Sequence, residues 1–320
     1  MKPYYDHAGI QIFHGDCREV LPGLPDCSVQ CCVTSPPYWG LRSYGVGTEN
    51  GEIGLEPTPE EYVATMVEVF REVRRVLRDD GTLWLNLGDT YASSGGERTY
   101  GSSDNVTGRG PGTRRHDVPA SGLKPKDLCG IPWRVAFALQ ADGWHLRQDI
   151  IWHKPNPMPE SVTDRCTKAH EYIFLMSKKP RYYYDAEAIK EDGVDPESYA
   201  GRNKRNPDAF TQAGKRSQYR DGFAKLEGQK CLTRNKRSVW TVTTKPFKEA
   251  HFATFPPDLI KPCILAGCPE GGVVLDPFGG SGTTAAAAKY HLRKAVSIEL
   301  NEEYLPMQKN RLAQEVLPFT

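Results

Sequence analysis

The sequence predicts an α/β protein built around a mostly parallel sheet. Short β-branched runs alternate with helical stretches in the first 90 residues, the same alternation returns near the C-terminus, and a glycine-rich turn links a strand to a helix there. Hydrophobic residues make up 38% of the 320 residues, which is enough for a folded core. The longest apolar runs span about five residues, too short for a membrane-spanning helix.

Three strands are expected in the N-terminal third. Residues 10–14 alternate between apolar and polar side chains, and residues 29–33 are a β-branched run that two prolines end. Residues 82–87 read as a buried strand. A helix between the second and third strands would make them parallel.

That helix is expected between residues 57 and 80. Its apolar residues recur at helical spacing, and Thr58 is a good N-cap because Glu61 follows three residues later. Asp80-Gly81 is the expected stop.

The C-terminal third returns to the same alternation. Helices are expected over residues 257–266 and 283–292, and strands over residues 272–276 and 294–299. Asn301 is the expected cap of a final helix that continues to about residue 312.

Two segments interrupt this pattern. Residues 91–127 hold seven glycines and five serines, which predicts a long mobile loop. Residues 202–237 hold eleven Lys/Arg against three Asp/Glu, a local excess of eight positive charges with aromatic and Asn side chains interleaved. This segment is typical of a polyanion-binding surface. A solvated, partly disordered insert is the alternative.

Charge and cysteine usage limit the class of protein. Lys and Arg number 41 and Asp and Glu 40, which excludes a uniformly basic coat. Nine cysteines form no CxxC pair, which argues against a structural zinc site. The N-terminus lacks the apolar stretch of a secretory signal, so reduced thiols in a cytoplasm are expected.

A glycine turn over residues 276–284 joins a predicted strand to a predicted helix. Its glycines allow a sharp bend and let a ligand approach main-chain N–H groups. Gly280, Gly282 and Ala285 fit a relaxed G-x-G-x-x-G pattern, and Glu299 ends the next strand, where an acid can accept from ribose hydroxyls. Together these features favour a nucleoside-containing ligand over a tight turn without one.

A second motif, Thr34-Ser-Pro-Pro-Tyr-Trp39, follows the strand over residues 29–33. Two prolines fix the backbone, so a hydroxyl, a carbonyl and an aromatic face lie close together. These groups suit an exocyclic amine on a flat ring, since oxygens accept from the amine while Tyr38 stacks on the base. For Ser-Pro-Pro alone, a strand end whose aromatic residues pack in the core would be the simpler reading.

The two motifs resemble those of S-adenosylmethionine-dependent DNA amino-methyltransferases, which methylate N4 of cytosine or N6 of adenine. The catalytic motif precedes the cofactor motif, the arrangement called the β class. Further segments that look like the family's are Gly15–Cys17, Ile150–Asn156, His170–Phe174 and His251–Pro256. The resemblance implies a Rossmann-like fold with a mostly parallel, seven-stranded sheet, a circularly permuted motif order and a DNA-recognition insertion.

The resemblance also assigns site residues. The implied catalytic residues are Ser35, Pro36, Pro37 and Tyr38. The implied cofactor residues are Asp16, Thr34, Phe255, Asp276, Phe278, Gly279, Gly280, Ser281, Gly282, Thr283, Thr284 and Glu299, with Asp16 expected to accept from the adenine amino group. The expected DNA-binding residues are Arg42, Arg202, Lys204, Arg205, Lys215, Arg216, Arg220, Arg234, Lys236 and Arg237. No metal is expected, and the roles of His153 and Lys154 are left open.

The same resemblance divides the chain and names its partners. The expected parts are residues 1–90 as the catalytic half of the methyltransferase domain, 91–127 as a flexible Gly/Ser-rich loop and 128–190 as the continuation of that domain. Residues 191–245 are expected to be a basic target-recognition insertion and residues 246–320 the cofactor-binding half. Double-stranded DNA is the expected substrate and S-adenosylmethionine the cofactor, with a cognate restriction endonuclease as a possible partner. We expect a cytoplasmic, prokaryotic or phage enzyme that associates with the nucleoid, and no membrane.

Serine at the first motif position favours cytosine N4 over adenine N6, for which family members usually carry Asp or Asn. The expected mechanism rotates the base out of the duplex, and its amine attacks the methyl group directly. Three other activities stay open: cytosine C5 methylation through Cys263, methylation of an RNA or protein amine, and an inactive DNA-binding relative. C5 chemistry needs a thiolate nucleophile, and Cys263 lies within a predicted helix.

Overall fold

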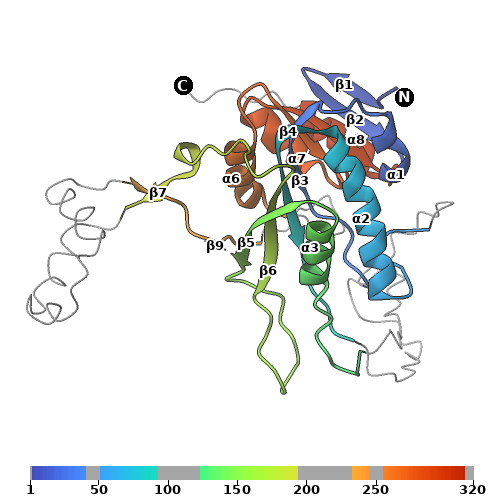
Figure 1. Cartoon of the computed structure of the whole chain (residues 1–320), viewed down its shortest axis with the longest axis vertical. Helices are drawn as coiled ribbons and strands as arrows, with labels where there is room; N and C mark the ends of the chain where they lie inside the picture. The colour runs from blue at the N-terminus through green and yellow to red at the C-terminus, as the bar shows by residue number, and fades with distance from the viewer. Residues whose placement is uncertain (1, 41–50, 93–122, 194–232, 245–254, 314–320) are drawn as a thin grey trace, which may run out of the picture. The chain divides into compact units, whose positions relative to one another are not determined.

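A computed structural model describes residues 2–40, 51–92, 123–193, 233–244 and 255–313 (Figure 1). The chain divides into two units, one formed by Met1–Tyr184 with Ser238–Thr320 and the other by Asp185–Arg237. The second unit overlaps the insertion predicted at residues 191–245, whose role in target recognition stays a prediction. Most of the loop predicted at 91–127 lies outside the described residues.

The first unit is built on one sheet, and the predicted α/β fold with mostly parallel strands is confirmed. The strand order is β1-β2-β11-β10-β3-β4-β6-β5-β9. All neighbours from β2 to β4 are parallel, as are β5 and β9, whereas β1 and β6 run antiparallel to their neighbours. The strands are β1 (Tyr5–His7), β2 (Ile10–His14), β3 (Val29–Thr34), β4 (Leu77–Leu87), β5 (His145–His153), β6 (His170–Ser177), β9 (Val239–Thr241), β10 (Val273–Asp276) and β11 (Lys294–Glu299).

The predicted number of seven strands is wrong, because this sheet has nine within the described residues. The two additional strands, β1 and β9, lie at the edges and have three residues each, too few to produce a periodic sequence signal. The glycine-turn strand β10 lies beside β11, and β11 lies beside β2. The first long strand of the chain therefore pairs with its last. The second unit contributes a ribbon of β7 (Glu191–Asp192) and β8 (Thr233–Arg234).

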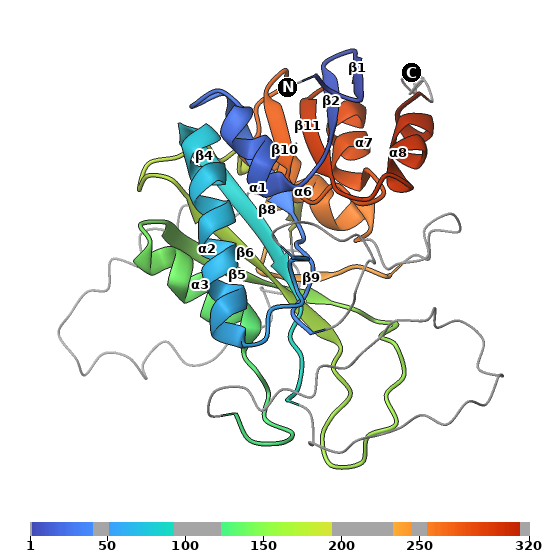
Figure 2. The same cartoon turned by 90° about the vertical axis from the view of Figure 1, so that its right-hand side faces the viewer.

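Helices cover both faces of the large sheet. On one face α2 (Pro59–Val76) and α3 (Ile131–Ala141) lie side by side over β4, β5 and β6 (Figure 2). On the other face α6 (Pro257–Gly267) comes so close that a Cβ at Gly267 would lie 2.5 Å from Trp84 Nε1. The remaining helices within the described residues are α1 (Cys17–Val20), α7 (Thr283–Tyr290), α8 (Tyr304–Ala313) and the short 3₁₀ turns Leu21–Gly23 and Glu187–Ile189.

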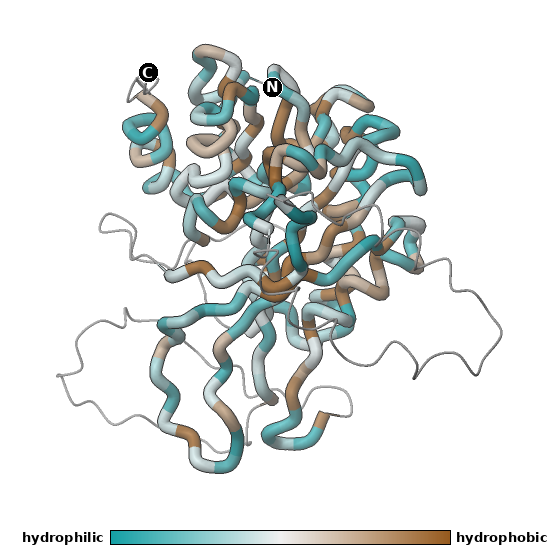
Figure 3. The backbone as a smooth tube through the Cα atoms, turned by 90° about the vertical axis from the view of Figure 1, so that its left-hand side faces the viewer, coloured by the Kyte–Doolittle hydropathy of each residue, from teal (hydrophilic) through white to brown (hydrophobic). Residues whose placement is uncertain are grey.

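The core follows the alternation of the strands. Leu83, Leu85 and Leu87 of β4 are buried on the face that α2 covers, whereas Trp84, between them in sequence, is buried on the face of α6. Apolar residues are concentrated along these inner segments of the backbone (Figure 3). No helix among the described residues is long and apolar enough to cross a bilayer.

The predicted end of helix α2 is also wrong. Thr58 caps the helix as expected, since its hydroxyl accepts from the Glu61 N–H at 3.2 Å. The helix stops at Val76, however, and Asp80-Gly81 lies inside β4. At this point β4 carries extra residues relative to β3, and a Cβ at Gly81 would lie 2.9 Å from the Arg78 carbonyl oxygen. Gly81 therefore allows an irregularity in the strand instead of ending a helix.

Four strands carry chemistry-bearing residues on the side of the sheet where the parallel strands have their carboxyl ends. The parallel strands β3, β10 and β11 end there at Thr34, Asp276 and Glu299. The antiparallel strand β6 starts on the same side, where Glu171 follows His170. Ligands of open α/β sheets bind at the carboxyl ends of the parallel strands, so these strand ends form the candidate site.

Candidate active site

A hydrogen bond joins the two motifs that the sequence analysis identified. The Thr34 hydroxyl at the end of β3 donates to Asp276 Oδ1 at 2.7 Å, across 242 positions of sequence. The Phe278 N–H donates to the same carboxylate oxygen at 3.1 Å, and burial raises the pKa of Asp276. The Thr284 hydroxyl donates to the Val33 carbonyl at 3.4 Å. The Ser-Pro-Pro turn and the glycine turn are therefore parts of one site.

The glycine turn needs its glycines for two different reasons. Gly280 and Gly282 have φ angles of +51° and +76°, which residues with a Cβ rarely adopt. A Cβ at Gly279 would lie 2.1 Å from Ser297 Oγ, so this position has no room for one. A Cβ at Gly280 would meet nothing closer than 3.9 Å, so the backbone there faces open space.

Glu299 lies next to this turn. Its two oxygens accept from the main-chain N–H groups of Gly280 at 2.6 Å and Asn301 at 2.7 Å. Burial raises the pKa of Glu299 to about 7. A buried acceptor beside an open glycine backbone suits a ligand that offers hydroxyl groups, and the ribose of a nucleoside is such a ligand.

Asp16 has local partners that the sequence analysis did not foresee. Its carboxylate caps α1 by accepting from the Arg18 N–H at 2.9 Å, and both of its oxygens bind the Arg18 guanidinium. Asp16 lies just after β2, the strand that pairs with β11. Its expected contact with an adenine amino group stays a prediction.

The other expected cofactor residues fall into two groups. Phe255 and Phe278 are half-buried. Ser281, Thr283 and Thr284 are buried, and Arg311 donates to the hydroxyls of Ser281 and Thr283 at 3.3 and 3.0 Å. These hydroxyls are bonded within the protein.

The Ser-Pro-Pro turn is held by its surroundings. The Tyr62 hydroxyl of α2 donates to the Pro37 carbonyl at 2.8 Å, and the Trp39 indole donates to the Glu56 carbonyl at 2.9 Å. The Pro36 carbonyl accepts no hydrogen bond from any described residue. A carbonyl held rigidly without a partner can accept from a ligand amine.

Tyr38 is anchored by its hydroxyl. It donates to Glu171 Oε2 at 2.8 Å, lies 3.1 Å from Asn86 Oδ1 and accepts from the Ser35 hydroxyl at 3.3 Å. Burial, followed by the charge of Glu171, raises the pKa of Tyr38 well above its ordinary value, so the phenol stays protonated. A Cβ at Gly88 would lie 2.5 Å from Tyr38 Cε2, so the ring rests against a bare backbone.

The sequence analysis assigned no role to three residues of this network. Asn86 is near the end of β4, Glu171 is the second residue of β6, and Lys154 forms an ion pair with Glu171. The Lys154 ammonium also lies 4.2 Å from the centre of the Trp152 ring. Lys154 and Glu171 both belong to segments that resemble the family's, which was the available signal. His153 bonds instead to the Thr241 hydroxyl of β9.

Three of the expected DNA-binding residues are described. Arg234 and Arg237 of the second unit both donate to Glu191 Oε1, at 3.0 and 2.6 Å. Lys236, the third residue, lies between them in the sequence. Their DNA contacts stay predictions, with part of their charge balanced by Glu191. The other expected DNA-binding residues, Arg42, Arg202, Lys204, Arg205, Lys215, Arg216 and Arg220, lie outside the described residues.

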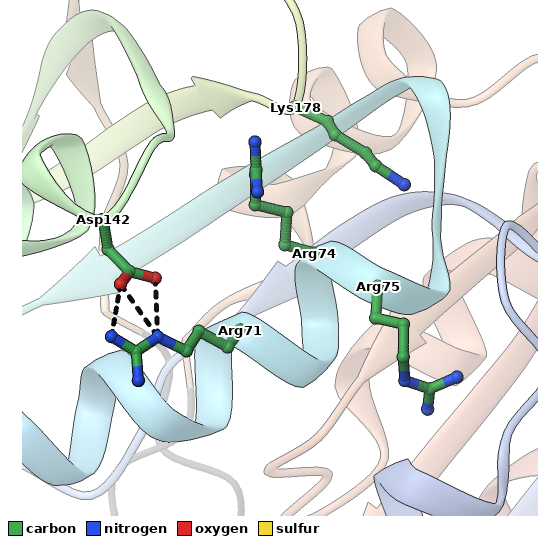
Figure 4. Close-up of a pocket in the computed structure, with 5 residues that line it drawn as sticks. All are labelled: Arg71, Arg74, Arg75, Asp142 and Lys178. Atoms are coloured by element: carbon green, nitrogen blue, oxygen red, sulfur yellow. Dashed lines mark hydrogen bonds and ion pairs between the residues drawn. The ribbon is translucent and has the colours of Figure 1, made fainter.

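A surface cavity of about 310 Å³ lies at the other ends of the strands, where α2 ends and β4 begins (Figure 4). Figure 4 shows Arg71 aimed at Asp142, to which it donates at 2.6 and 2.8 Å. Nearby, Arg75 pairs with Asp26 and Glu72, and Lys178 lies 3.6 Å from Asp79. Neither motif contributes to this cavity, so it is not the candidate active site. No group of three or more His, Cys, Asp or Glu among the described residues could hold a metal ion.

Comparison with known proteins identifies the family. The model of the DNA methylase family N6_N4_Mtase matches residues 29–310, which include both motifs. The chain belongs to this DNA methylase family. It is a β-class DNA amino-methyltransferase, and the resemblance predicted from the two motifs is confirmed. S-adenosylmethionine, the predicted cofactor, is the methyl donor that family membership assigns to this methylase.

Similar proteins support the family along nearly the whole chain. The Type II methyltransferase M.Cfr9I of Citrobacter freundii is 48% identical over 307 residues, which are 96% of this chain and 89% of that protein. The Type II methyltransferase M.SmaI of Serratia marcescens is 47% identical over 302 residues, 94% of this chain and 90% of that protein. The methylase is therefore a Type II DNA methyltransferase of the N4/N6 family.

Solved structures share its fold. A PvuII DNA methyltransferase described as cytosine-N4-specific superposes with a TM-score of 0.64 at 18% identity, covering 99% of this chain and 90% of that one. The Thermus thermophilus protein TTHA0409, in complex with S-adenosylmethionine, superposes with a TM-score of 0.58 at 24% identity, covering 97% of this chain and 96% of that one. The methyltransferase fold is thereby confirmed.

Proposed function

We propose that this methylase transfers a methyl group to the N4 amine of cytosine within a specific sequence of double-stranded DNA. The observation that carries the proposal is the hydrogen bond from Thr34 to Asp276, because it puts Ser35 directly beside the turn that follows β10. A cofactor on the glycine turn and a base on the Ser-Pro-Pro turn would then lie close enough to react.

The residues of the glycine turn fit the methyl donor. Glu299 would accept from the ribose hydroxyls, and the backbone at Gly280 leaves room for the ligand to approach. Thr34 and Asp276 would form the wall between donor and base. When bound, S-adenosylmethionine supplies an electrophilic methyl carbon, and the bonding electrons of that carbon remain on sulfur.

The Ser-Pro-Pro turn would bind the target base. The base must leave the duplex, at a cost of a few kcal/mol. Ser35 Oγ and the Pro36 carbonyl would accept from its amine, localising the nitrogen lone pair that attacks the methyl carbon. The ring of Tyr38, which is half-buried and tied by its hydroxyl, would contact the base face. Catalysis would consist mainly of positioning and of hydrogen bonding to a changing amine.

Serine at position 35 is the feature that favours cytosine. The PvuII enzyme of similar fold is described as cytosine-N4-specific, which supports the same choice. Methylation of adenine N6 by the same geometry is the alternative. Cytosine C5 chemistry is disfavoured because Cys263 is buried in α6, with its thiol directed at the Leu259 carbonyl.

The relatives support a proposal for the partners and the cellular setting. Those named above are Type II methyltransferases of bacteria, so we propose a bacterial cytoplasmic enzyme with a cognate restriction endonuclease. The basic segment 202–237 would neutralise DNA phosphates, and affinity would then fall steeply with salt.

One experiment tests the function. Duplex DNA is methylated with labelled S-adenosylmethionine, digested to nucleosides and separated by mass. N4-methyldeoxycytidine is the expected product, and N6-methyldeoxyadenosine would overturn the base assignment. Ser35→Ala should abolish most incorporation, whereas Ser28→Ala, which removes an exposed hydroxyl bonded to the Pro25 carbonyl, should leave it unchanged.

A further inference from the structure

The Tyr38 hydroxyl lies between two hydrogen-bond acceptors. The phenol has one proton, and both Glu171 Oε2 at 2.8 Å and Asn86 Oδ1 at 3.1 Å face its oxygen. The Asn86 amide is held in one orientation, because its Nδ2 donates to the Tyr172 carbonyl at 3.0 Å and to Glu171 Oε2 at 3.3 Å. The carboxylate oxygen is the nearer of the two acceptors, so the Tyr38 proton is directed at Glu171.

The same contacts can hold one added proton. A protonated Glu171 would donate to the Tyr38 oxygen, and Tyr38 would donate to Asn86 Oδ1. The Ser35 hydroxyl, 3.3 Å from the Tyr38 oxygen, would use the second lone pair of that oxygen. The network therefore accommodates a neutral Glu171 when the Tyr38 hydroxyl turns from one acceptor to the other.

Lys154 holds Glu171 from the side that does not face Tyr38. Its ammonium pairs with Glu171 Oε1, the carboxylate oxygen that does not face Tyr38. Oε2 is thereby left to the Tyr38 hydroxyl and the Asn86 amide. The resting network then has a defined direction: Ser35 donates to Tyr38, and Tyr38 donates to Glu171. The free lone pairs of Ser35 Oγ are left to accept from a base amine.

We propose that Glu171 is the final acceptor of the proton that the target amine loses, with Ser35 and Tyr38 relaying it. As the new carbon–nitrogen bond forms, an amine N–H bond breaks and its electron pair stays on nitrogen. That proton passes to Ser35 Oγ, the Ser35 proton passes to Tyr38, and the Tyr38 proton passes to Glu171 Oε2. The carboxylate becomes a neutral acid, and both hydroxyls are restored.

This inference rests on the proposed function, since it needs an exocyclic amine at Ser35. Within the described residues, the charged and titratable groups that act on Glu171 are Lys154, Tyr38, Lys168 and His170. Burial lowers the pKa of Lys168, and burial together with Lys168 lowers the pKa of His170. Among the described residues, no hydrogen bond links His170 to Ser35, Tyr38 or Glu171, so the imidazole is not part of the relay.

The test is single-turnover methyl transfer to duplex DNA, followed across pH. Glu171→Gln keeps the size and polarity of the side chain but cannot take the proton, so the rate should fall by about 100-fold or more. The DNA dissociation constant should stay within about twofold, because Glu171 itself does not touch the base. The fall in rate at acidic pH should also disappear, and Glu171→Asp should restore part of the rate.

Two further variants separate the relay from a structural role. Tyr38→Phe keeps the ring but removes the relaying hydroxyl, so it should match Glu171→Gln in rate and in pH profile. Glu160→Gln removes a carboxylate of another ion pair, the one with Arg165, and should behave as wild type. A wild-type rate and pH profile for Glu171→Gln would overturn the relay, and so would a loss of DNA affinity as large as the loss of rate. A wild type that makes N6-methyladenine would instead overturn the base assignment alone, because that amine also loses a proton.

Discussion

The protonation of Glu299 should make the stability of the cofactor-free protein depend on pH. Burial raises its pKa from 4.5 to about 7. Each pKa unit corresponds to about 1.4 kcal/mol, so the fully ionised group costs the fold at most about 3 kcal/mol. The sign follows from the raised pKa: the stabilising contribution is complete below pH 4.5 and is lost as the pH rises towards 7.

Glu299→Gln tests this reasoning, because it removes the titration and keeps the shape. The free energy of unfolding is measured in urea without cofactor at about pH 5.5 and about pH 8.5. Over that range, linkage predicts that wild type loses about 2 kcal/mol more than the variant. The change with pH is the quantity to compare, since glutamine cannot accept well from both Gly280 and Asn301, and the absolute stability shifts for that reason too.

The matched control is Glu302→Gln, an exposed carboxylate three residues further along the chain. It should follow the pH dependence of wild type. His170 and His291, whose pKa values burial lowers, titrate equally in all three proteins and cancel from the comparison. If Glu299→Gln and wild type lose the same stability over this range, Glu299 is not the buried acid described above.

Three other substitutions give distinct outcomes. Gly88→Ala puts a Cβ 2.5 Å from Tyr38 Cε2, so the ring must move and the single-turnover rate should fall by about 100-fold; a wild-type rate would show that the ring position does not matter. Thr34→Val removes the donor to Asp276 and should cost about 1–3 kcal/mol in urea unfolding and weaken cofactor binding; unchanged stability and affinity would mean that the bond contributes nothing. Cys263→Ala should keep methylation near wild type and lose roughly 1 kcal/mol of stability; complete loss of activity would revive a thiol nucleophile.

The sequence predicted the parts of the site that lie on contiguous motifs. Thr34 and Asp276 end strands that the sequence marks clearly, and both belong to motifs with fixed spacing. Glu299 could be predicted because an acid at the end of the next strand has a known geometric role. Local pattern and motif order were therefore sufficient to predict that these strand ends meet, whereas the cofactor contacts of their residues stay predictions.

The network around Tyr38 could not be predicted in the same way. Asn86 and Glu171 meet because β6 runs antiparallel to β4, and nothing in either segment states that pairing. Helix α3 was also missed, although Pro132 near its start and apolar residues at Ile131 and Val135 follow helical spacing. Strand partners and their direction are decided by the whole sheet, so contacts across it cannot be read from one segment.

The contact between Thr34 and Asp276 has a consequence for how the enzyme folds during its synthesis on the ribosome. The catalytic turn is synthesised early, but β10, the strand that pairs with β3 on that side, emerges some 240 residues later. Until then one edge of β3 has no partner, and exposed strand edges invite aggregation. A nascent chain therefore acquires a methyl-transfer centre only once its last third has been translated and inserted, which should make folding slow and dependent on protection of that edge.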